Sequence, residues 1–320
     1  MDVLYKYYSD KLDADYFDKP TLKLTSSATL NDPFEKIVPS DLDEMTLEMY
    51  SAATNKDSKI KLSRTFNNIT NRIYNRACGI VSLSETPRNI LMWSHYTNQH
   101  KGICIGYKSN MLVNKEKENP DYPCHYQPIK INYDNRRFDK YTDIIKGATL
   151  SEVRREILTK SLTTKSNDWM YEKEHRLIIP MLDYDDIKYI GKDSLSLLLG
   201  DSIEITSENT FKVRPGNEIL INNFLDSSDY MFRKDINKSD IVSIYFGCDI
   251  SQKYKFEILK KIQSGYNANQ IKLFQITPHK NEFELIPRPV DIKLRHLFST
   301  CFNILMENED HYNLCNDTHL

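Results

Sequence analysis

Short runs of β-branched and aromatic residues recur along this chain of 320 residues, and they limit its fold more than any other feature. Each run is brief and ends at glycine, proline or polar residues, which is the pattern of β-strands. The predicted strands cover residues 3–8, 21–25, 78–83, 103–107, 129–133, 177–179, 241–246 and 271–276. Helical patterns with one apolar face lie between several of them, at residues 40–76, 89–96, 141–165 and 251–263. We therefore predict an α+β fold with small, mostly antiparallel sheets and helices between them.

The order of these elements indicates one main domain followed by a short extension. Residues 241–276 form a strand, helix, strand unit, which favours a crossover between parallel strands. Residues 183–218 have no clear period and are interpreted as an irregular insertion with a short helix. We place the main domain at 1–292 and a C-terminal helix with a polar tail at 293–320. The apolar face of that helix is expected either to dock on its own domain or to bind a partner protein.

The composition is that of an ordinary globular protein. A hydrophobic content of 40% and a formal net charge of −2 argue against a disordered chain and against a polybasic nucleic-acid wrapper, and they leave room for a local basic groove. No stretch resembles a membrane-spanning helix, and the N-terminal MDVLYKYYSD lacks the apolar core of a secretion signal. We therefore expect a cytoplasmic protein. The six cysteines include no C-x-x-C pair, so neither a disulfide framework nor a cysteine zinc site is predicted.

The acidic stretch that precedes the strand at 177–179 is the strongest candidate for chemistry. Glu172, Glu174 and Arg176 are spaced by two, so in extended geometry they project from one face. One interpretation is a solvated strand face with a local ion pair. The other is a catalytic carboxylate that the arginine orients at the mouth of a cleft. Residue types and spacing leave both interpretations open.

Other polar and aromatic residues lie where predicted strands end. Asn31 and Asp32 occur in the loop TLNDPFE, where they belong either to a ligand site or to a plain Asx turn closed by proline. Trp93 and Tyr96 either offer a flat surface to a ring-shaped substrate or pack in the core. The two histidines nearby are five residues apart, so a zinc pair on one helical face is not expected. No metal site, G-x-G-x-x-G sequence or P-loop is predicted.

Six short sequences line up in order with the landmarks of a known family. They are LYKY at 4–7, TLNDPFE at 29–35, GIVSLSE at 79–85, LMWSHYTNQHKGICIGY at 91–107, WMYEKEHRLI at 169–178 and IVSIYFG at 241–247. Together they resemble a widespread bacterial family classed as a domain of unknown function, which is recognised by NDPFE, MWSHY, HKG and the E-K-E-x-R run. The resemblance extends to about residue 290.

The chain also resembles the ADP-ribosyltransferase fold, whose enzymes use NAD as a substrate. This resemblance implies that a first-strand residue contacts NAD, that a serine follows the second strand, and that a glutamate opening a late strand is catalytic. The implied catalytic group is Glu172, Glu174 and Arg176, and the implied NAD-binding group is Tyr5, Lys6, Ser26, Ser27, Asn31, Asp32, Trp93, His95 and Tyr96. The first strand departs from the usual pattern, because Tyr-Lys stands where such enzymes have His or Arg.

The implied activity is transfer of ADP-ribose from NAD to a nucleic acid or a protein, in a bacterial toxin or phage-defence effector. An antitoxin or chaperone is the implied partner of residues 293–320. A carboxylate suits this chemistry because removing nicotinamide leaves positive charge on the ribose. Two other hypotheses stay open. One is a non-catalytic module that binds a nucleotide or nucleic acid, and the other is a metal-dependent nuclease that uses Asp32, Glu35, Glu172 and Glu174.

Overall fold

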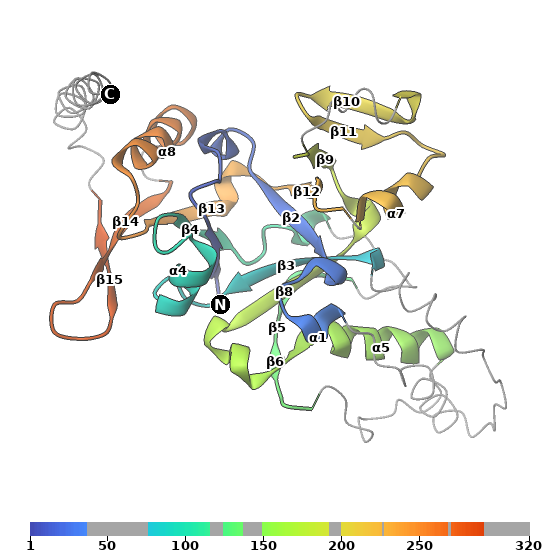
Figure 1. Cartoon of the computed structure of the whole chain (residues 1–320), viewed down its shortest axis with the longest axis horizontal. Helices are drawn as coiled ribbons and strands as arrows, with labels where there is room; N and C mark the ends of the chain where they lie inside the picture. Colours follow the sequence, from blue (N-terminus) through green and yellow to red (C-terminus); the bar gives the residue numbers. More distant parts are fainter. Residues whose placement is uncertain are drawn as a thin grey trace, which may run out of the picture.

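The computed structural model describes residues 1–36, 76–115, 124–136, 149–191, 200–225, 227–267 and 270–290. Within them, one mixed, mostly antiparallel sheet of 13 strands dominates (Figure 1). Its main path runs in the order β10 (Ile203–Ser207), β11 (Thr210–Val213), β9 (Asp186–Tyr189), β12 (Tyr230–Asp235), β2 (Thr21–Ser26), β3 (Cys78–Ser84), β1 (Val3–Tyr8), β4 (Ile103–Lys108), β13 (Ile241–Phe246), β14 (Lys272–Pro278) and β15 (Leu285–Pro289). Off this path, β8 (Glu174–Pro180) pairs with β3, and β5 (His125–Lys130) pairs with β8. A small second sheet pairs β6 (Asn132–Tyr133) with β7 (Thr164–Lys165).

The predicted α+β class is confirmed, but the predicted small sheets are wrong. The reason is β3, which pairs with different strands along its length: Gly79 and Ile80 lie opposite β2, and Ser84 lies opposite β1. This shared strand joins two groups of strands into one sheet. Residues 183–218, expected to be irregular, contain β9, β10 and β11 and extend the sheet at one end. β13 and β14 pair in parallel, as the strand, helix, strand unit predicts.

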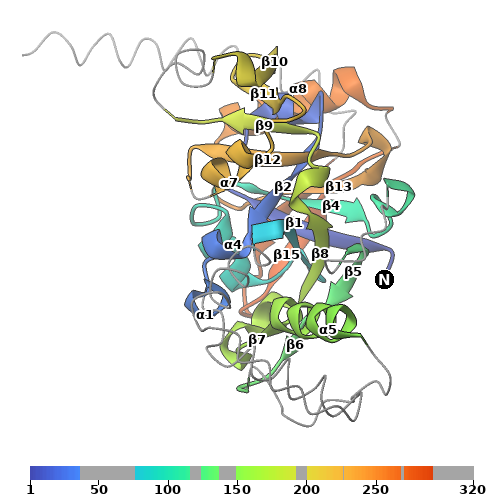
Figure 2. The ribbon, with the colours of Figure 1, turned by 90° about the vertical axis from the view of Figure 1, so that its right-hand side faces the viewer.

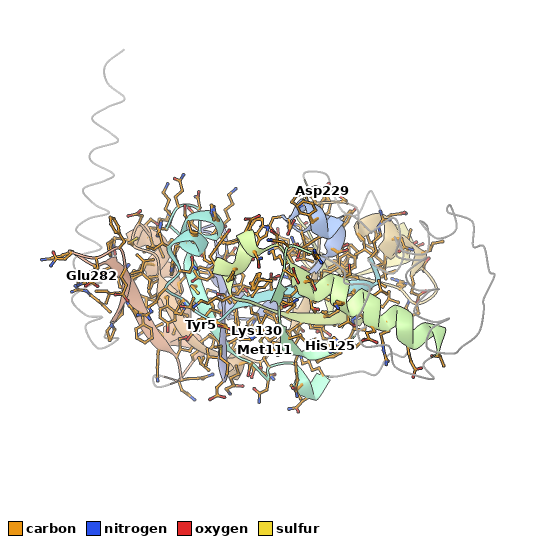
Figure 3. All side chains as sticks on the ribbon, turned by 90° about the horizontal axis from the view of Figure 1, so that it is seen from below. Tyr5, Met111, His125, Lys130, Asp229 and Glu282 are labelled. Atoms are coloured by element: carbon orange, nitrogen blue, oxygen red, sulfur yellow. The ribbon has the colours of Figure 1, made fainter. Side chains whose placement is uncertain are left out.

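The α-helices of the described residues lie around this sheet. They are α1 (Pro33–Lys36), α4 (Ile90–Tyr96), α5 (Leu150–Thr163), α7 (Ile219–Leu225) and α8 (Gln252–Gly265). Asn89 caps α4, and Thr149 forms a capping box with Glu152 at the start of α5. Helix α5 and the strands β9 to β11 lie at opposite ends of the molecule (Figure 2), and the view from below shows α5 on the outside (Figure 3). Residues 40–75 of the first predicted helix and the whole predicted C-terminal segment at 293–320 lie outside the described residues.

The main hydrophobic cluster draws on strands from both parts of the sheet. It includes residues of β1, β3, β4, β8 and β13 together with residues of β9, β11 and β12, among them Leu4, Val81, Ile105, Leu177, Ile244, Ile187, Phe211 and Phe232. All of these side chains are buried, so the strands are held together by apolar packing as well as by their hydrogen-bonded ladders. Among the described residues, no helix combines the length and the apolarity that crossing a bilayer requires.

The turn between α4 and β4 brings the backbone unusually close to β1. Asn98, Gln99 and His100 all have left-handed backbone angles, with φ of 51°, 56° and 67°. The HKG sequence then ends at Gly102, where an added Cβ atom would lie 2.0 Å from the carbonyl oxygen of Tyr8. Glycine is therefore required at this position by the close approach of two backbone segments.

We expect Gly102→Ala to lower the free energy of unfolding by about 1–3 kcal/mol or more, because backbone atoms must shift to admit the methyl group. Gly265→Ala at the end of α8 is the matched control. Its nearest neighbour would be the flexible Lys238 ammonium at 3.2 Å, so the change is expected to be neutral or stabilising by up to about 1 kcal/mol. Urea unfolding measures both variants, and equal losses would contradict the expected backbone clash.

Candidate functional site

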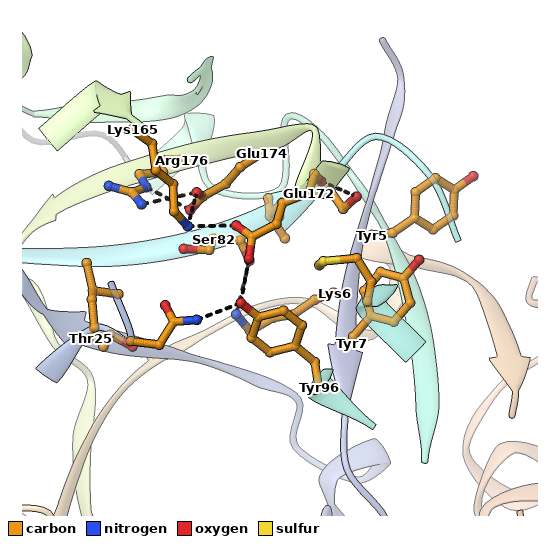
Figure 4. Close-up of a pocket in the computed structure, with 15 residues that line it drawn as sticks. Tyr5, Lys6, Tyr7, Thr25, Ser82, Tyr96, Lys165, Glu172, Glu174 and Arg176 are labelled. Atoms are coloured by element: carbon orange, nitrogen blue, oxygen red, sulfur yellow. Dashed lines mark hydrogen bonds and ion pairs between the residues drawn. The ribbon is translucent and has the colours of Figure 1, made fainter. Parts of the chain in front are cut away.

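A pocket of about 180 Å³ lies where β1, β2, β3 and the start of β8 meet (Figure 4). It is walled on one side by β1 and α4 and on another by the carboxylates and cations that precede and begin β8. Its lining residues come from widely separated parts of the chain: Tyr5, Lys6, Tyr7, Thr25, Leu30, Asn31, Ser82, Leu83, Ser84, Met92, Tyr96, Lys165, Glu172, Glu174 and Arg176. Seven of these are site residues that the sequence predicts, namely Tyr5, Lys6, Asn31, Tyr96, Glu172, Glu174 and Arg176.

Glu172 and Glu174 reach this pocket by a route that differs from the predicted one. Glu172 is the last residue of a short 3-10 helix, η4 (Asn167–Glu172), and is not part of an extended strand. Lys173 then adopts a left-handed conformation with φ of 46°, and β8 begins at Glu174. This left-handed turn directs both carboxylates to the same pocket. The strand ends at Pro180 as predicted, since proline cannot donate to the ladder.

Glu174 lies in a buried network of charges. Arg176 donates from Nε to Glu174 Oε1 at 2.7 Å and from Nη2 to Oε2 at 3.1 Å, and it also donates to the carboxylate of Glu35 and to the carbonyl oxygen of Leu162. The Lys165 ammonium donates to Glu174 Oε2 at 3.2 Å. The side chains of Glu174 and Arg176 are only 3% and 1% exposed. The interpretation as a solvated strand face is therefore wrong. Arg176 pairs with Glu174, and both residues line the pocket.

Glu172 has a different environment, because one of its oxygens contacts a neutral side chain. Lys165 donates to Glu172 Oε2 at 2.7 Å, and the Tyr96 hydroxyl donates to Oε1 at 2.5 Å. Asn31 in turn donates from Nδ2 to the Tyr96 hydroxyl at 2.7 Å. Burial, together with the neighbouring Glu172 carboxylate, raises the pKa of Tyr96, so its hydroxyl keeps its proton. A chain of hydrogen bonds thus runs from Glu172 through Tyr96 to the exposed Asn31.

Lys6 supplies a cation on the β1 side of the pocket. Its ammonium donates to the carbonyl oxygen of Ser82 at 3.1 Å, and among the described residues it forms no salt bridge. Burial lowers the pKa of Lys6 to about 8, although the charge of Glu174 opposes this shift. Tyr5 packs edge-on against Tyr245 with ring centroids 5.8 Å apart. The pocket therefore contains the Lys6 amine, which has no ion-pair partner among the described residues, beside two carboxylates. Its two other cations, Lys165 and Arg176, both form ion pairs.

Five of the predicted NAD-binding residues do not line the pocket. Ser26 and Ser27 are buried beside it, and Thr25 occupies the wall instead. Asp32 accepts a hydrogen bond from the backbone N–H of Phe34, as in the Asx turn that the sequence allows. The other two lie on α4. Trp93 is fully buried and donates to the carbonyl oxygen of Pro87, whereas His95 is exposed at the surface with its ring 6.3 Å from that of Tyr171.

Lys165 and Glu35 complete the charge network, and the sequence argument assigned neither of them to this role. Glu35 comes from α1 in the NDPFE sequence, and burial raises its pKa despite the opposing charge of Arg176. Lys165 comes from β7, and the two carboxylates it bridges raise its pKa against the effect of burial. No local pattern marks Lys165, because its partners follow it by seven and nine residues across an irregular turn. Among the described residues, no group of three or more His, Cys, Asp or Glu side chains is arranged to hold a metal ion.

The paired state of Glu174 predicts an acid-sensitive contribution to stability. Burial alone would raise its pKa, but the charges of Arg176 and Lys165 outweigh burial and lower the pKa to about 2. The unfolded chain therefore takes up this proton first, and the stabilisation present above pH 4.5 is lost as the pH falls toward 2. The loss is on the order of 3 kcal/mol. Between pH 7 and pH 3, the free energy of unfolding measured with urea should fall less in Glu174→Gln than in the wild type. An equal fall in the two proteins would contradict this assignment.

Comparisons with known proteins bear on part of this site. No curated protein and no solved structure gives a significant match to the chain. A family model covers the segment from α4 to β8, which contains Tyr96, Lys165, Glu172, Glu174 and Arg176. This segment is shorter than the predicted span up to about residue 290, and the ADP-ribosyltransferase resemblance stays a prediction. That model is described as "Protein of unknown function (DUF2971)", and residues 92–177 are similar to it, in agreement with the predicted type of family.

Proposed function

We propose that the protein is a transferase that breaks the nicotinamide–ribose bond of NAD and transfers ADP-ribose to a nucleic acid or a protein, in the manner of a toxin or phage-defence effector. The observation that carries this proposal is the position of Glu172. Its carboxylate lines a pocket together with Lys6 of β1, and Tyr96 links it by hydrogen bonds to the exposed Asn31.

The chemistry requires a carboxylate that is charged and available. As the bond to nicotinamide breaks, positive charge develops on the ribose, and a fixed carboxylate stabilises that state more than the ground state. Glu174 is a poor candidate because both of its oxygens already accept from Arg176 and Lys165. Glu172 is the better one, because Tyr96 is a neutral partner that a ribose hydroxyl can replace. We assign Glu172 to the ribose and Glu174 to holding Lys165 and Arg176 in place.

The reaction balances without a metal or a redox partner. The glycosidic C–N bond breaks, nicotinamide leaves as a neutral molecule, and a bond forms between the ribose carbon and an oxygen or nitrogen of the acceptor. The acceptor loses one proton, for which Lys6 is the candidate base, because burial lowers its pKa to about 8. The Lys165 and Arg176 cations already fill the space between the carboxylates, which disfavours the alternative of a metal-dependent nuclease.

The test is to incubate the purified protein with NAD and to measure free nicotinamide by chromatography, with and without RNA, DNA and protein extracts. We expect nicotinamide to accumulate and to increase when the acceptor is present. NAD that binds saturably but is never consumed would overturn the proposal in favour of a nucleotide-binding module. Cleavage of nucleic acid that EDTA abolishes would overturn it in favour of the nuclease.

A further inference from the structure

Outside the pocket, α4 and η4 share a surface of exposed apolar and aromatic side chains. On α4, Leu91 is 46% exposed, and His95 lies on the same helical face because it follows by four residues. On η4, Met170 is 54% exposed and lies between Trp169 and Tyr171, which are partly exposed. An exposed surface of this kind is a recurrent mark of a binding site.

Three rings of this surface form a row, which we call the aromatic rim: His95, Tyr171 and Trp169. The rings of His95 and Tyr171 have centroids 6.3 Å apart and are tilted by 46°, and those of Tyr171 and Trp169 are 6.1 Å apart and tilted by 36°. Neither pair is stacked face to face, so these rings do not cover one another's faces. Asn89 donates to the carbonyl oxygen of Tyr171 at 2.6 Å, which holds η4 against α4 and keeps the row in place.

The aromatic rim continues directly from the pocket. His95 precedes Tyr96, and Tyr171 precedes Glu172, so two of the three rim residues are bonded to a residue that lines the pocket. Lys165 links the two regions further, since its ammonium lies 4.6 Å from the centre of the Trp169 ring while it donates to Glu172. A ligand that extends out of the pocket past Glu172 would therefore meet aromatic rings first.

The pocket is too small to hold a whole dinucleotide. Its volume is about 180 Å³, whereas pockets for drug-sized ligands span roughly 300–1,000 Å³. A pocket of this volume can enclose only part of a dinucleotide, so part of NAD would extend out of it. We propose that the aromatic rim stacks on the adenine base of NAD while its nicotinamide half occupies the pocket, an inference that rests on the proposed function.

Tryptophan fluorescence offers a direct test of this inference. The chain has two tryptophans, and Trp93 is fully buried while Trp169 belongs to the aromatic rim, so a ligand at the surface changes the emission of Trp169. Titration with AMP is expected to quench the emission saturably. Ribose 5-phosphate, which lacks the base, is expected to have no effect. Quenching by single-stranded oligonucleotides without quenching by AMP would overturn the inference, because the rim would then bind the bases of a nucleic acid.

Two substitutions at one position separate stacking from folding. Trp169→Ala is expected to weaken the binding of AMP and NAD about 5- to 150-fold, as measured by calorimetry. Trp169→Phe keeps a ring over Lys165, so it should bind AMP almost as well as the wild type while losing the fluorescence response. Thermal unfolding of both variants shows whether they are folded. Equal affinity of Trp169→Ala and the wild type for AMP would overturn the inference.

The failure of this inference and the failure of the proposed function have different signatures. Nicotinamide release that persists in Trp169→Ala with an unchanged KM for NAD would refute the aromatic rim and leave the transferase standing. AMP binding that depends on Trp169 in a protein that never releases nicotinamide would support the rim and refute the transferase.

Discussion

Glu172→Gln is expected to lower the rate of nicotinamide release from NAD by about 10²–10³-fold, the usual effect of removing one fixed electrostatic contact to a transition state. Glutamine keeps the shape of the side chain and its contact with Tyr96, but it carries no charge to oppose the charge on the ribose. The fold should survive, because Lys165 retains Glu174 as a charged partner at 3.2 Å. The measurement is single-turnover release of nicotinamide, with thermal unfolding in parallel.

The matched control for this prediction is Glu85→Gln. Glu85 follows β3, pairs with Lys130 at 2.9 Å and does not line the pocket. Its replacement should leave nicotinamide release unchanged. Full activity in Glu172→Gln would remove the role assigned to this carboxylate, and equal losses in the two variants would indicate a general disturbance of the fold. Glu174→Gln is a less informative variant, because it also weakens the buried pairs with Arg176 and Lys165.

The second large effect is expected at Arg176. Its guanidinium lies 1% exposed between two carboxylates, and replacing it with methionine leaves both Glu174 and Glu35 without their strongest partner. Removing one member of a buried ion pair typically costs about 3–5 kcal/mol, because the remaining charge stays buried without compensation. We therefore expect Arg176→Met to lower the free energy of unfolding by this amount and the thermal midpoint by roughly 10 °C.

Arg88→Met is the control for the Arg176 prediction, since it makes the same chemical change at the surface. Arg88 pairs with Glu284 at 3.0 Å, and the two side chains are 54% and 47% exposed. Such a pair contributes about 0–1 kcal/mol. Urea unfolding of both variants gives the comparison. A loss at Arg176 no greater than at Arg88 would mean that the buried network contributes little to stability.

Much of the secondary structure follows from short local patterns. β1 at Val3–Tyr8 and β13 at Ile241–Phe246 have the predicted bounds, and α4 begins shortly after the predicted Ser-Glu-Thr-Pro start. These elements depend on side-chain alternation, capping and proline placement, all of which act within a few residues. Residues 183–218 lack a strong local period, and their strands form because β9 pairs with β11 and β12.

The charge network shows where local reasoning stops. Arg176 contacts Glu35, which is 141 residues away, and Tyr96 contacts Glu172 across 76 residues. Such pairs depend on which strands lie side by side in the fold. The spacing of apolar residues along the chain, with a period of two in a strand or 3.6 in a helix, does not contain that information. The predicted serines illustrate this limit, because a difference of one residue in β2 puts Thr25 at the pocket in place of Ser26.

By itself, the sequence determined that two glutamates and an arginine occur within five residues of one another just ahead of a buried strand, together with the α+β class and the positions of most strands. Only the tertiary structure decided that Glu174 is fully engaged by Arg176 and Lys165 and that Glu172 faces Tyr96 in a pocket. The physical reason is that burial and charge pairing depend on segments that are distant in the chain. The chemistry available to a carboxylate depends on those neighbours more than on its own position in the sequence.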